Sequence, residues 1–155
     1  MRNKNPESVM GVYHSPVPLF PALMLLAETW AEARSKDPNT AVGAIVYHEP
    51  TGAMYFGYNG FPVGVEDNIE WWDDREVKHS LVAHAETNAI RRAHCGIGED
   101  LSDCYMVVSK LPCCQCLRAH IAPARLQRIW YKPSEDDKRD YVLEKRLNVQ
   151  LQPLE

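Results

Sequence analysis

Residues 41–58 read AVGAIVYHEPTGAMYFGY, and this stretch decides the fold because it holds two strand signals around one turn signal. Small, β-branched and aromatic residues fill residues 41–47 and 53–58, as is typical of strands. The residues EPTG at 49–52 interrupt them and favour a chain reversal. We therefore expect a β-hairpin at the start of the sheet.

The residues before the hairpin carry a helical pattern. Apolar residues recur at helical spacing between Leu23 and Trp30, which predicts an amphipathic helix over residues 21–35. Its apolar face is wide, so the helix is either deeply buried or in contact with a second subunit. Residues 1–19 are expected to form an irregular N-terminal segment.

Helices and strands alternate after the hairpin. A polar and aromatic loop over residues 59–78 leads to a helix over residues 83–94. Pro112 is expected to open a helix that ends near Ile121, since proline is tolerated in a first turn. Further strands are expected over residues 105–109, 128–131 and 149–151.

A charged helix is expected between the last two strands. Ser134 is its predicted N-cap, and Arg146 lies near its end. Asp136 and Asp137 in the first turn and Lys145 in the last turn suit the helix dipole.

This order predicts a three-layer α/β/α fold. The five strands should form a mixed sheet with helices on both faces. A helix between the fourth and fifth strands makes that pair parallel. No repeat, low-complexity tract or linker divides the chain, so residues 1–155 are expected to form a single domain.

Charge and hydropathy exclude several classes of ligand. Seventeen Lys and Arg against 21 Asp and Glu give a net charge of −4, which disfavours a long nucleic acid but allows a mononucleotide. No run approaches the roughly 20 apolar residues of a membrane helix. The start MRNKNPESVM is unlike a signal peptide, so a cytoplasmic location is expected.

The cysteine pattern suggests metal ligation. The chain has five cysteines, an odd number, and Cys113, Cys114 and Cys116 lie together, which suits a reducing compartment better than a disulfide framework. Cys95 and Cys104 are expected to be core residues.

Two short motifs carry the chemistry: His84-Ala85-Glu86 and the residues PCCQC at 112–116. A catalytic zinc takes three protein ligands and keeps a fourth position open, and His84, Cys113 and Cys116 supply three. Cysteines at i and i+3 of a helix face one point, which makes Cys114 the poorer ligand. Both motifs are expected to start helices, whose positive ends favour thiolates.

Glu86 lies beside the metal histidine without being needed as a ligand. It is therefore free to move protons between water and substrate, as hydrolytic deamination requires. His-x-Glu followed by Pro-Cys-x-x-Cys is a signature of zinc deaminases. Each motif alone is weak, since a His-x-Glu triplet arises by chance and a Cys-x-x-Cys also occurs in structural zinc knuckles and redox pairs.

Further segments carry a family resemblance: SKDPNTAVGA at 35–44, GYNGFPVG at 57–64 and HAETNAI at 84–90. On these and the zinc motifs, the chain resembles the deoxycytidylate deaminase branch of the cytidine deaminase superfamily from about residue 23 to the C-terminus. The superfamily shares the zinc motifs, whereas the GYNGxPxG pattern is more particular to this branch. A turn would also explain Asn59-Gly60 without any ligand.

The resemblance implies a cytidine-deaminase-like fold, one catalytic Zn²⁺ and a defined reaction. By this resemblance, zinc hydroxide is expected to attack C4 of deoxycytidine monophosphate (dCMP), and Glu86 is expected to protonate N3. Ammonia and deoxyuridine monophosphate (dUMP) leave, the latter supplying thymidylate synthesis. The resemblance places Asn59 against the 3′-hydroxyl, the Ala85 N–H against the carbonyl at C2, and carbonyls of residues 109–111 near the departing amine.

The 5′-phosphate needs cations, and Lys110 and Lys132 are candidates from their places at the ends of predicted elements. By resemblance, a homohexamer is expected. Deoxycytidine triphosphate (dCTP), together with Mg²⁺, should activate it, and thymidine triphosphate (dTTP) should inhibit it. Candidate effector residues are Gly57, Asn59, Gly60 and Gly64.

Two alternative functions remain open. The chain could deaminate another base, such as free cytidine or a tRNA adenosine, although the acidic balance disfavours tRNA. It could instead be an inactive zinc-stabilised module that only binds nucleotides or assembles. The presence of Glu86 speaks against that module, which would need no proton shuttle.

Overall fold

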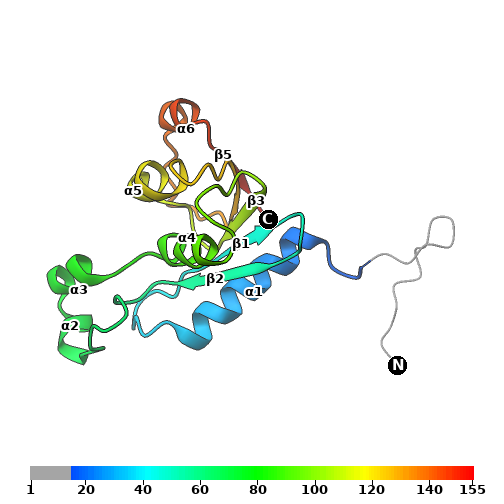
Figure 1. Ribbon diagram of the computed structural model, residues 1–155. Coiled ribbons are helices and arrows are strands. Elements are labelled where there is room, and N and C mark those ends of the chain that lie inside the picture. Colours follow the sequence, from blue (N-terminus) through cyan, green and yellow to red (C-terminus); the bar gives the residue numbers. More distant parts are fainter. Residues whose placement is uncertain (1–14) are drawn as a thin grey trace, which may run out of the picture.

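The computed structural model describes residues 15–155, in which a five-stranded mixed sheet lies between helices (Figure 1). The strand order is β2-β1-β3-β4-β5. β1 pairs antiparallel with β2 and β3, whereas β4 runs parallel to both β3 and β5. The strands are β1 (Gly43–His48), β2 (Met54–Tyr58), β3 (Cys104–Val108), β4 (Arg128–Tyr131) and β5 (Gln150–Pro153). The predicted hairpin, mixed sheet and parallel final pair are confirmed.

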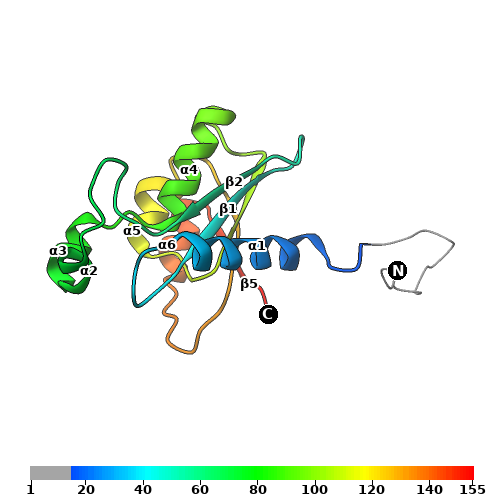
Figure 2. The ribbon, with the colours of Figure 1, turned by 90° about the horizontal axis from the view of Figure 1, so that it is seen from below.

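Helices cover both faces of the sheet, also as predicted. The long helix α1 lies on one face and α4 on the other, which Figures 1 and 2 show from two directions. The helices are α1 (Leu19–Arg34), α2 (Ile69–Asp73), α3 (Arg75–Leu81), α4 (Ala85–Gly96), α5 (Cys114–Cys116) with the π-helix η2 (Leu117–Ile121), and α6 (Tyr141–Leu147).

Side chains along each strand point alternately to the two faces of the sheet, and this divides the core in two. Ile45 of β1 and Val107 of β3 pack with Leu23 and Ala27 of α1. The neighbouring strand residues face the other way, and they pack with buried residues of α4 and η2, including Ala89 and Ile121. The period of two in each strand therefore supplies one apolar surface to each helical layer.

The segment expected to be a loop, residues 59–78, instead holds α2 and the start of α3, which continues to Leu81. Asn68 caps α2 by accepting from the Glu70 N–H at 2.8 Å, and Asp74 caps α3 by accepting from the Glu76 N–H at 2.9 Å. Trp72 is buried and stacks on Phe61 at 3.9 Å between ring centroids. We call residues 66–81 the α2–α3 segment, and it projects from the sheet in both ribbon views (Figures 1 and 2).

Two predicted helix starts are wrong. Pro112 precedes the helix, and Cys113 is the N-cap of α5. α6 begins at Tyr141 with Asp140 as its cap, because the Asp140 carboxylate accepts from the Leu143 N–H at 2.9 Å.

The residues expected in the first turn of that helix form a turn of their own. The Ser134 N–H donates to the Asp137 carboxylate at 2.8 Å, and the Asp136 N–H donates to the Ser134 hydroxyl at 3.4 Å. The prediction for the basic end is confirmed, since Lys145 and Arg146 lie in the last turn of α6.

Smaller differences concern single residues. Cys104 is buried as expected, but Cys95 is exposed near the end of α4. α1 begins at Leu19, inside the segment expected to be irregular, and residues 1–14 of that segment lie outside the described residues. Among the described helices, none is long and apolar enough to cross a membrane.

Candidate active site

Three potential metal ligands meet where two helices begin. His84 is the N-cap residue of α4, Cys113 is the N-cap residue of α5, and Cys116 is the last residue of α5. Their donor atoms all lie within 4.8 Å of one another. His84 Nδ1 is 3.6 Å from Cys113 Sγ and 3.4 Å from Cys116 Sγ. Cys114, the poorer ligand by helix geometry, is exposed and outside this cluster.

A glycine in β2 sets the position of α4. A Cβ atom at Gly57 would lie 2.2 Å from the Ala85 carbonyl oxygen and 2.4 Å from the Ala89 nitrogen. Only glycine therefore lets α4 lie this close to β2. Gly60 adds a second anchor, since its N–H donates to the Ala83 carbonyl at 3.1 Å and its carbonyl accepts from the Ala83 N–H at 2.8 Å.

Hydrogen bonds among the sulfur and nitrogen donors shift their pKa values. Hydrogen bonds with Cys116 and His84 lower the pKa of the Cys113 thiol to about 3, and the Cys116 N–H supports this by donating to Cys113 Sγ at 3.4 Å. The hydrogen bond with Cys113 raises the pKa of His84. The hydrogen bond with Cys113 and burial raise the pKa of the Cys116 thiol. The cluster thus stabilises a thiolate, the form that binds metal.

This donor set fits zinc. Two cysteine sulfurs and one imidazole nitrogen are ligands that zinc favours, and three protein ligands leave one coordination position for a reactant. His84 contributes Nδ1 to the cluster. A zinc ion is therefore the expected occupant.

Glu86 lies in the first turn of α4, two residues after His84, and is only 4% exposed. Burial raises the pKa of its carboxyl to about 7, against the opposing effect of the positive charges of His84 and Lys110. A carboxyl group with a pKa near neutrality can both accept and return a proton. The site therefore places, beside the three candidate metal ligands, a carboxyl group whose pKa suits acid–base chemistry.

A cavity of about 250 Å³ opens onto these groups. Val42, Val82 and Leu111 give it an apolar wall, and His84, Glu86 and Cys113 give it a reactive end. The other lining residues are Asp37, Thr40, Asn59, Lys78, His79, Ala85 and Lys110. The predicted residues Asn59, Ala85 and Lys110 are therefore brought to the same cavity as His84 and Cys113.

Lys132 lies elsewhere. It lines a neighbouring cavity of about 580 Å³ and forms an ion pair with Glu28. Lys110 lines both cavities, as do Thr40 and Val42. The two predicted phosphate ligands thus belong to adjoining spaces, with Lys110 at their junction.

The candidate effector glycines do not share one space. Gly60 lines a hollow of about 50 Å³ together with Arg91 and Arg92. Gly64 has a φ of +91°, and a Cβ atom there would meet no heavy atom within 4 Å, so backbone conformation is what favours glycine. Gly57 packs against α4. Gly60 lacks a positive φ and forms an isolated bridge with Ala83, so a turn with positive φ does not explain this glycine.

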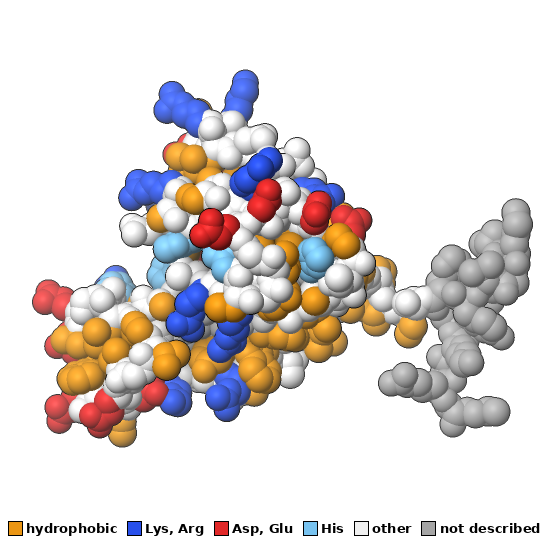
Figure 3. Space-filling model, in the orientation of Figure 1, with side chains coloured by type: hydrophobic (Ala, Val, Ile, Leu, Met, Phe, Trp, Pro, Cys, Tyr) orange, Lys and Arg blue, Asp and Glu red, His pale blue; other side chains and the backbone are white. Residues whose placement is uncertain are grey.

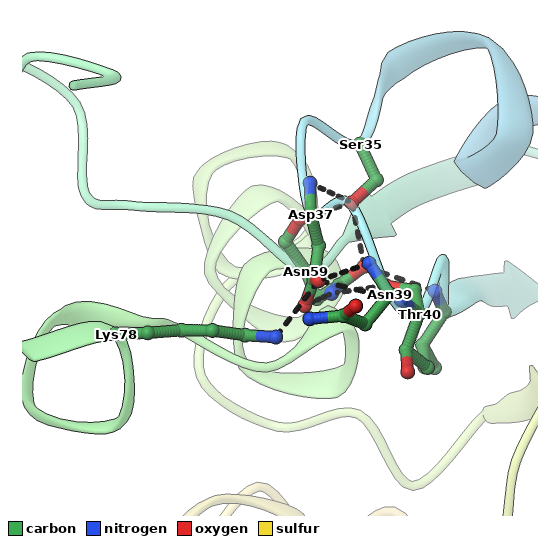
Figure 4. Close-up of polar contacts among 7 residues, drawn as sticks. Ser35, Asp37, Asn39, Thr40, Asn59 and Lys78 are labelled. Atoms are coloured by element: carbon green, nitrogen blue, oxygen red, sulfur yellow. Dashed lines mark hydrogen bonds and ion pairs between the residues drawn. The ribbon is translucent and has the colours of Figure 1, made fainter. Parts of the chain in front are cut away.

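A polar network in the cavity wall, drawn in Figure 4, goes beyond what sequence reasoning predicts. Asp37 accepts from Lys78 Nζ at 2.8 Å and from Asn59 Nδ2 at 3.2 Å. Asp37 lies in the SKDPNTAVGA segment, but its partner Lys78 falls in the stretch expected to be a loop. His79 also lines the cavity, and it follows directly on that stretch, where the sequence offers no signal for a site residue.

The fold and the site together define a class: an α/β metalloprotein with three zinc ligands at two helix starts and a buried carboxyl group beside them. The chain belongs to the cytidine and deoxycytidylate deaminase family, because the model of its zinc-binding region matches residues 21–132. This match includes all three ligands and Glu86.

Individual proteins similar to this chain belong to the same family by name. A probable deoxycytidylate deaminase of Caenorhabditis elegans is 37% identical over 107 residues, which cover 67% of this chain and 52% of the relative. The deoxycytidylate deaminase of Homo sapiens is 32% identical over 104 residues, covering 64% and 57%. The chain thus spans little more than half the length of these curated relatives.

A solved structure supports the fold. The dCMP deaminase of cyanophage S-TIM5 in its apo form superposes with a TM-score of 0.65 at 25% identity, covering 86% of this chain and 95% of the cyanophage chain. Its complex with dCMP and dUMP superposes with a TM-score of 0.66 at 23% identity, over the same shares of both chains. The cytidine-deaminase-like fold expected from the sequence is confirmed.

Proposed function

We propose that this protein is a zinc-dependent hydrolase that deaminates dCMP to dUMP and ammonia. The observation that carries the proposal is the placement of Glu86, a buried carboxyl group with a pKa of about 7, in the same cavity as His84 and Cys113. A module that only binds nucleotides has no use for this arrangement.

His84, Cys113 and Cys116 would hold the zinc ion. When bound, zinc acts as a Lewis acid and lowers the pKa of water, which supplies a nucleophile near neutral pH. Glu86 accepts a proton from the attacking water and donates it to N3 of the pyrimidine. It then moves the proton of the hydroxyl formed at C4 to the amine, so that the C4–N bond breaks, the C4 carbonyl forms and ammonia leaves.

Other residues orient the base. Val42, Val82 and Leu111 offer apolar surface to the faces of a pyrimidine ring. The Ala85 N–H, at the start of α4, is assigned to the carbonyl at C2, where the positive end of the helix also favours oxygen. Carbonyls of residues 109–111 are assigned to the departing amine.

Three observations support dCMP over the alternative substrates, such as free cytidine or a tRNA adenosine. The GYNGFPVG segment at 57–64 has the pattern of the deoxycytidylate deaminase branch. The relatives in Caenorhabditis elegans and Homo sapiens bear that activity in their names. Lys110 stands at the junction of two cavities, where it can meet a 5′-phosphate, and Lys132 lines the adjoining space.

A substrate panel tests this proposal directly. Zinc content is measured first, and ammonia release is then followed with dCMP, deoxycytidine, CMP, cytidine and a tRNA adenosine substrate. We expect zinc-loaded protein to act on dCMP with the highest kcat/KM. Zinc-loaded protein without dCMP turnover would refute the proposed substrate. Turnover of another compound of the panel would identify the substrate that the protein accepts instead.

Assembly and regulation form a second part of the proposal. On α1, Leu25, Leu26 and Trp30 are 61%, 43% and 39% exposed, while Leu23 and Ala27 are buried, so α1 has both a core face and an apolar outer face. In the orientation of Figure 1, α1 lies on the lower side of the molecule, and Figure 3 shows hydrophobic side chains there. An apolar surface of this kind suits a subunit contact, as in a homohexamer.

dCTP with Mg²⁺ as activator and dTTP as inhibitor are the proposed effectors, with Gly60 and Gly64 as candidate contacts, whereas Gly57 is packed against α4. dCMP titrations at several concentrations of each triphosphate, paired with a mass measurement in solution, test both points. Activation should make the substrate curve less sigmoidal, because the activator must favour one state. A monomer with hyperbolic kinetics, indifferent to both triphosphates, would contradict this part alone.

A further inference from the structure

The side-chain amide of Asn59 is fully engaged within the protein. Its Oδ1 accepts from the Val42 N–H at 2.9 Å and from the Ser35 hydroxyl at 2.9 Å, whose single proton it shares with the Asn59 backbone carbonyl at 3.0 Å. Its Nδ2 donates to the Thr40 carbonyl at 2.8 Å and to Asp37 Oδ2 at 3.2 Å. These bonds use both lone pairs and both N–H groups of an amide. Asn59 therefore shapes the cavity wall, and a sugar hydroxyl at that wall needs other partners.

Asp37 and Lys78 lie beside it as a mostly buried ion pair (Figure 4). Lys78 Nζ is 2.8 Å from Asp37 Oδ1, and the side chains of Lys78 and Asp37 are 13% and 4% exposed. Both residues line the cavity that contains Glu86 and His84. An ion pair that lies almost out of water but borders the cavity is placed to meet a ligand.

The pair retains hydrogen-bonding capacity. An ammonium group has three N–H donors, and Lys78 uses one of them on Asp37. Asp37 Oδ1 accepts from Lys78 and from the Asn39 and Thr40 N–H groups, whereas Oδ2 accepts only from Asn59 among the described residues. Lys78 Nζ can therefore donate a further hydrogen bond, and Asp37 Oδ2 can accept one.

The charge of the pair selects the kind of group it can bind. A phosphate would meet the attraction of Lys78 but also the repulsion of the Asp37 carboxylate. A hydroxyl is neutral, and it donates one hydrogen bond while accepting others. The pair therefore matches a hydroxyl better than an anion.

We infer that the Asp37–Lys78 ion pair binds the 3′-hydroxyl of the substrate sugar, which donates to Asp37 Oδ2 and accepts from Lys78 Nζ. This assignment rests on the proposed nucleotide substrate. It moves sugar recognition from Asn59 to two residues joined across the cavity wall, and it makes the α2–α3 segment part of the substrate site. Asn59 then acts as a positioning residue, because its Nδ2 holds Asp37 Oδ2 in place.

A second ion pair provides a matched control. Lys36 pairs with Asp67, so it joins the same two segments that Asp37 and Lys78 join. The Lys36 side chain is 63% exposed, and neither Lys36 nor Asp67 lines the cavity. Lys36→Met therefore loosens the same attachment without removing a group from the cavity.

The experiment compares kcat/KM for dCMP and for 2′,3′-dideoxycytidine monophosphate, which lacks only the 3′-hydroxyl. The wild-type protein, Lys78→Met, Asp37→Asn and Lys36→Met are assayed after zinc content and thermal unfolding are checked. Hydrogen bonds to charged groups are strong, so the wild-type protein should prefer dCMP by about tenfold or more. Lys78→Met should bring the ratio close to one through loss on dCMP, and Lys36→Met should keep the wild-type ratio.

The outcomes separate this inference from the proposed function. Lys78→Met that loses activity equally on both substrates and keeps the wild-type ratio would show a structural role only and overturn the inference. A wild-type ratio near one would overturn it as well. Absence of dCMP turnover by the wild-type protein would instead refute the proposed function. Should Asp37→Asn fail to fold, Lys78→Met alone decides, once its zinc content and thermal unfolding match those of Lys36→Met.

Discussion

His84 and Cys113 hold equivalent positions in two different helices. Each is the N-cap residue, and the His84 Nδ1 and Cys113 Sγ atoms lie 3.6 Å apart. Both donors thus sit where backbone N–H groups point outward and favour negative charge. Zinc binding at this site therefore depends on the meeting of the two helix starts.

Glu86→Gln should keep zinc and fold but lose turnover. The amide preserves shape while removing the proton-transfer group, a contribution of about 10²–10⁴-fold. Zinc content, circular dichroism and ammonia release check this, with the exposed Glu99→Gln as control. Turnover within a few fold of the wild-type value would remove Glu86 from the mechanism.

Cys116→Ser should lose zinc together with activity, whereas Cys114→Ser should retain both. A hydroxyl is a poor substitute for a thiolate ligand, and Cys114 lies outside the donor cluster. Metal content per chain distinguishes the two variants. The reverse result would mean that Cys114 is the ligand in solution.

Gly57→Ala should destabilise the protein and weaken zinc binding. Its Cβ would lie 2.2 Å from the Ala85 carbonyl oxygen, so α4 must shift and carry His84 with it. Overpacking of this kind costs about 1–3 kcal/mol. In Gly60→Ala the nearest atom is a Tyr58 ring carbon at an ordinary 3.5 Å, so that variant should unfold near the wild-type temperature. Equal melting temperatures for both variants would contradict the close approach.

Stability at acid pH should depend on Asp37. Burial raises the pKa of its carboxyl, but hydrogen bonds from Lys78 and from the Asn39 and Thr40 N–H groups, with the charge of Lys78, lower it below 3.8 overall. A carboxyl with a lowered folded-state pKa stabilises the protein above its unfolded-state pKa and loses that contribution as pH falls through the folded-state value.

Asp37→Asn should therefore be less stable than the wild-type protein at pH 7, by about 1–3 kcal/mol for a disrupted, mostly buried network. The difference should shrink below about pH 4. Urea unfolding at pH 7, 5, 4 and 3 measures it. A difference that is constant over this range would show that ionisation of Asp37 does not contribute.

The metal ligands can be predicted because they lie in two short motifs, and local spacing sets their geometry. The bounds of β4 agree with the prediction because Arg128–Tyr131 is a short strand-forming run between irregular stretches. Helix starts are harder to predict. Asp140, not Ser134, caps α6, and several acidic residues near that point offer competing caps.

The Asp37–Lys78 pair could not be found from the sequence. Its members are 41 residues apart, and lysines in polar stretches usually lie in solvent. Lys78 lies in α3, one of two short helices that Asn68 and Asp74 cap within a stretch that resembles a loop. Local capping signals are present there, but the tertiary contact that makes them functional is not visible in the sequence.

The anchoring of both helix starts also bears on how the protein gains its metal. Backbone hydrogen bonds between Gly60 and Ala83 fix the approach to His84, and the sheet core lies beneath both helices. Many small zinc domains fold only when the ion binds, because the metal replaces a missing core. Here the donors are preorganised by a core that does not include the metal. Chelation should leave circular dichroism nearly unchanged, and added zinc should reconstitute the site without refolding.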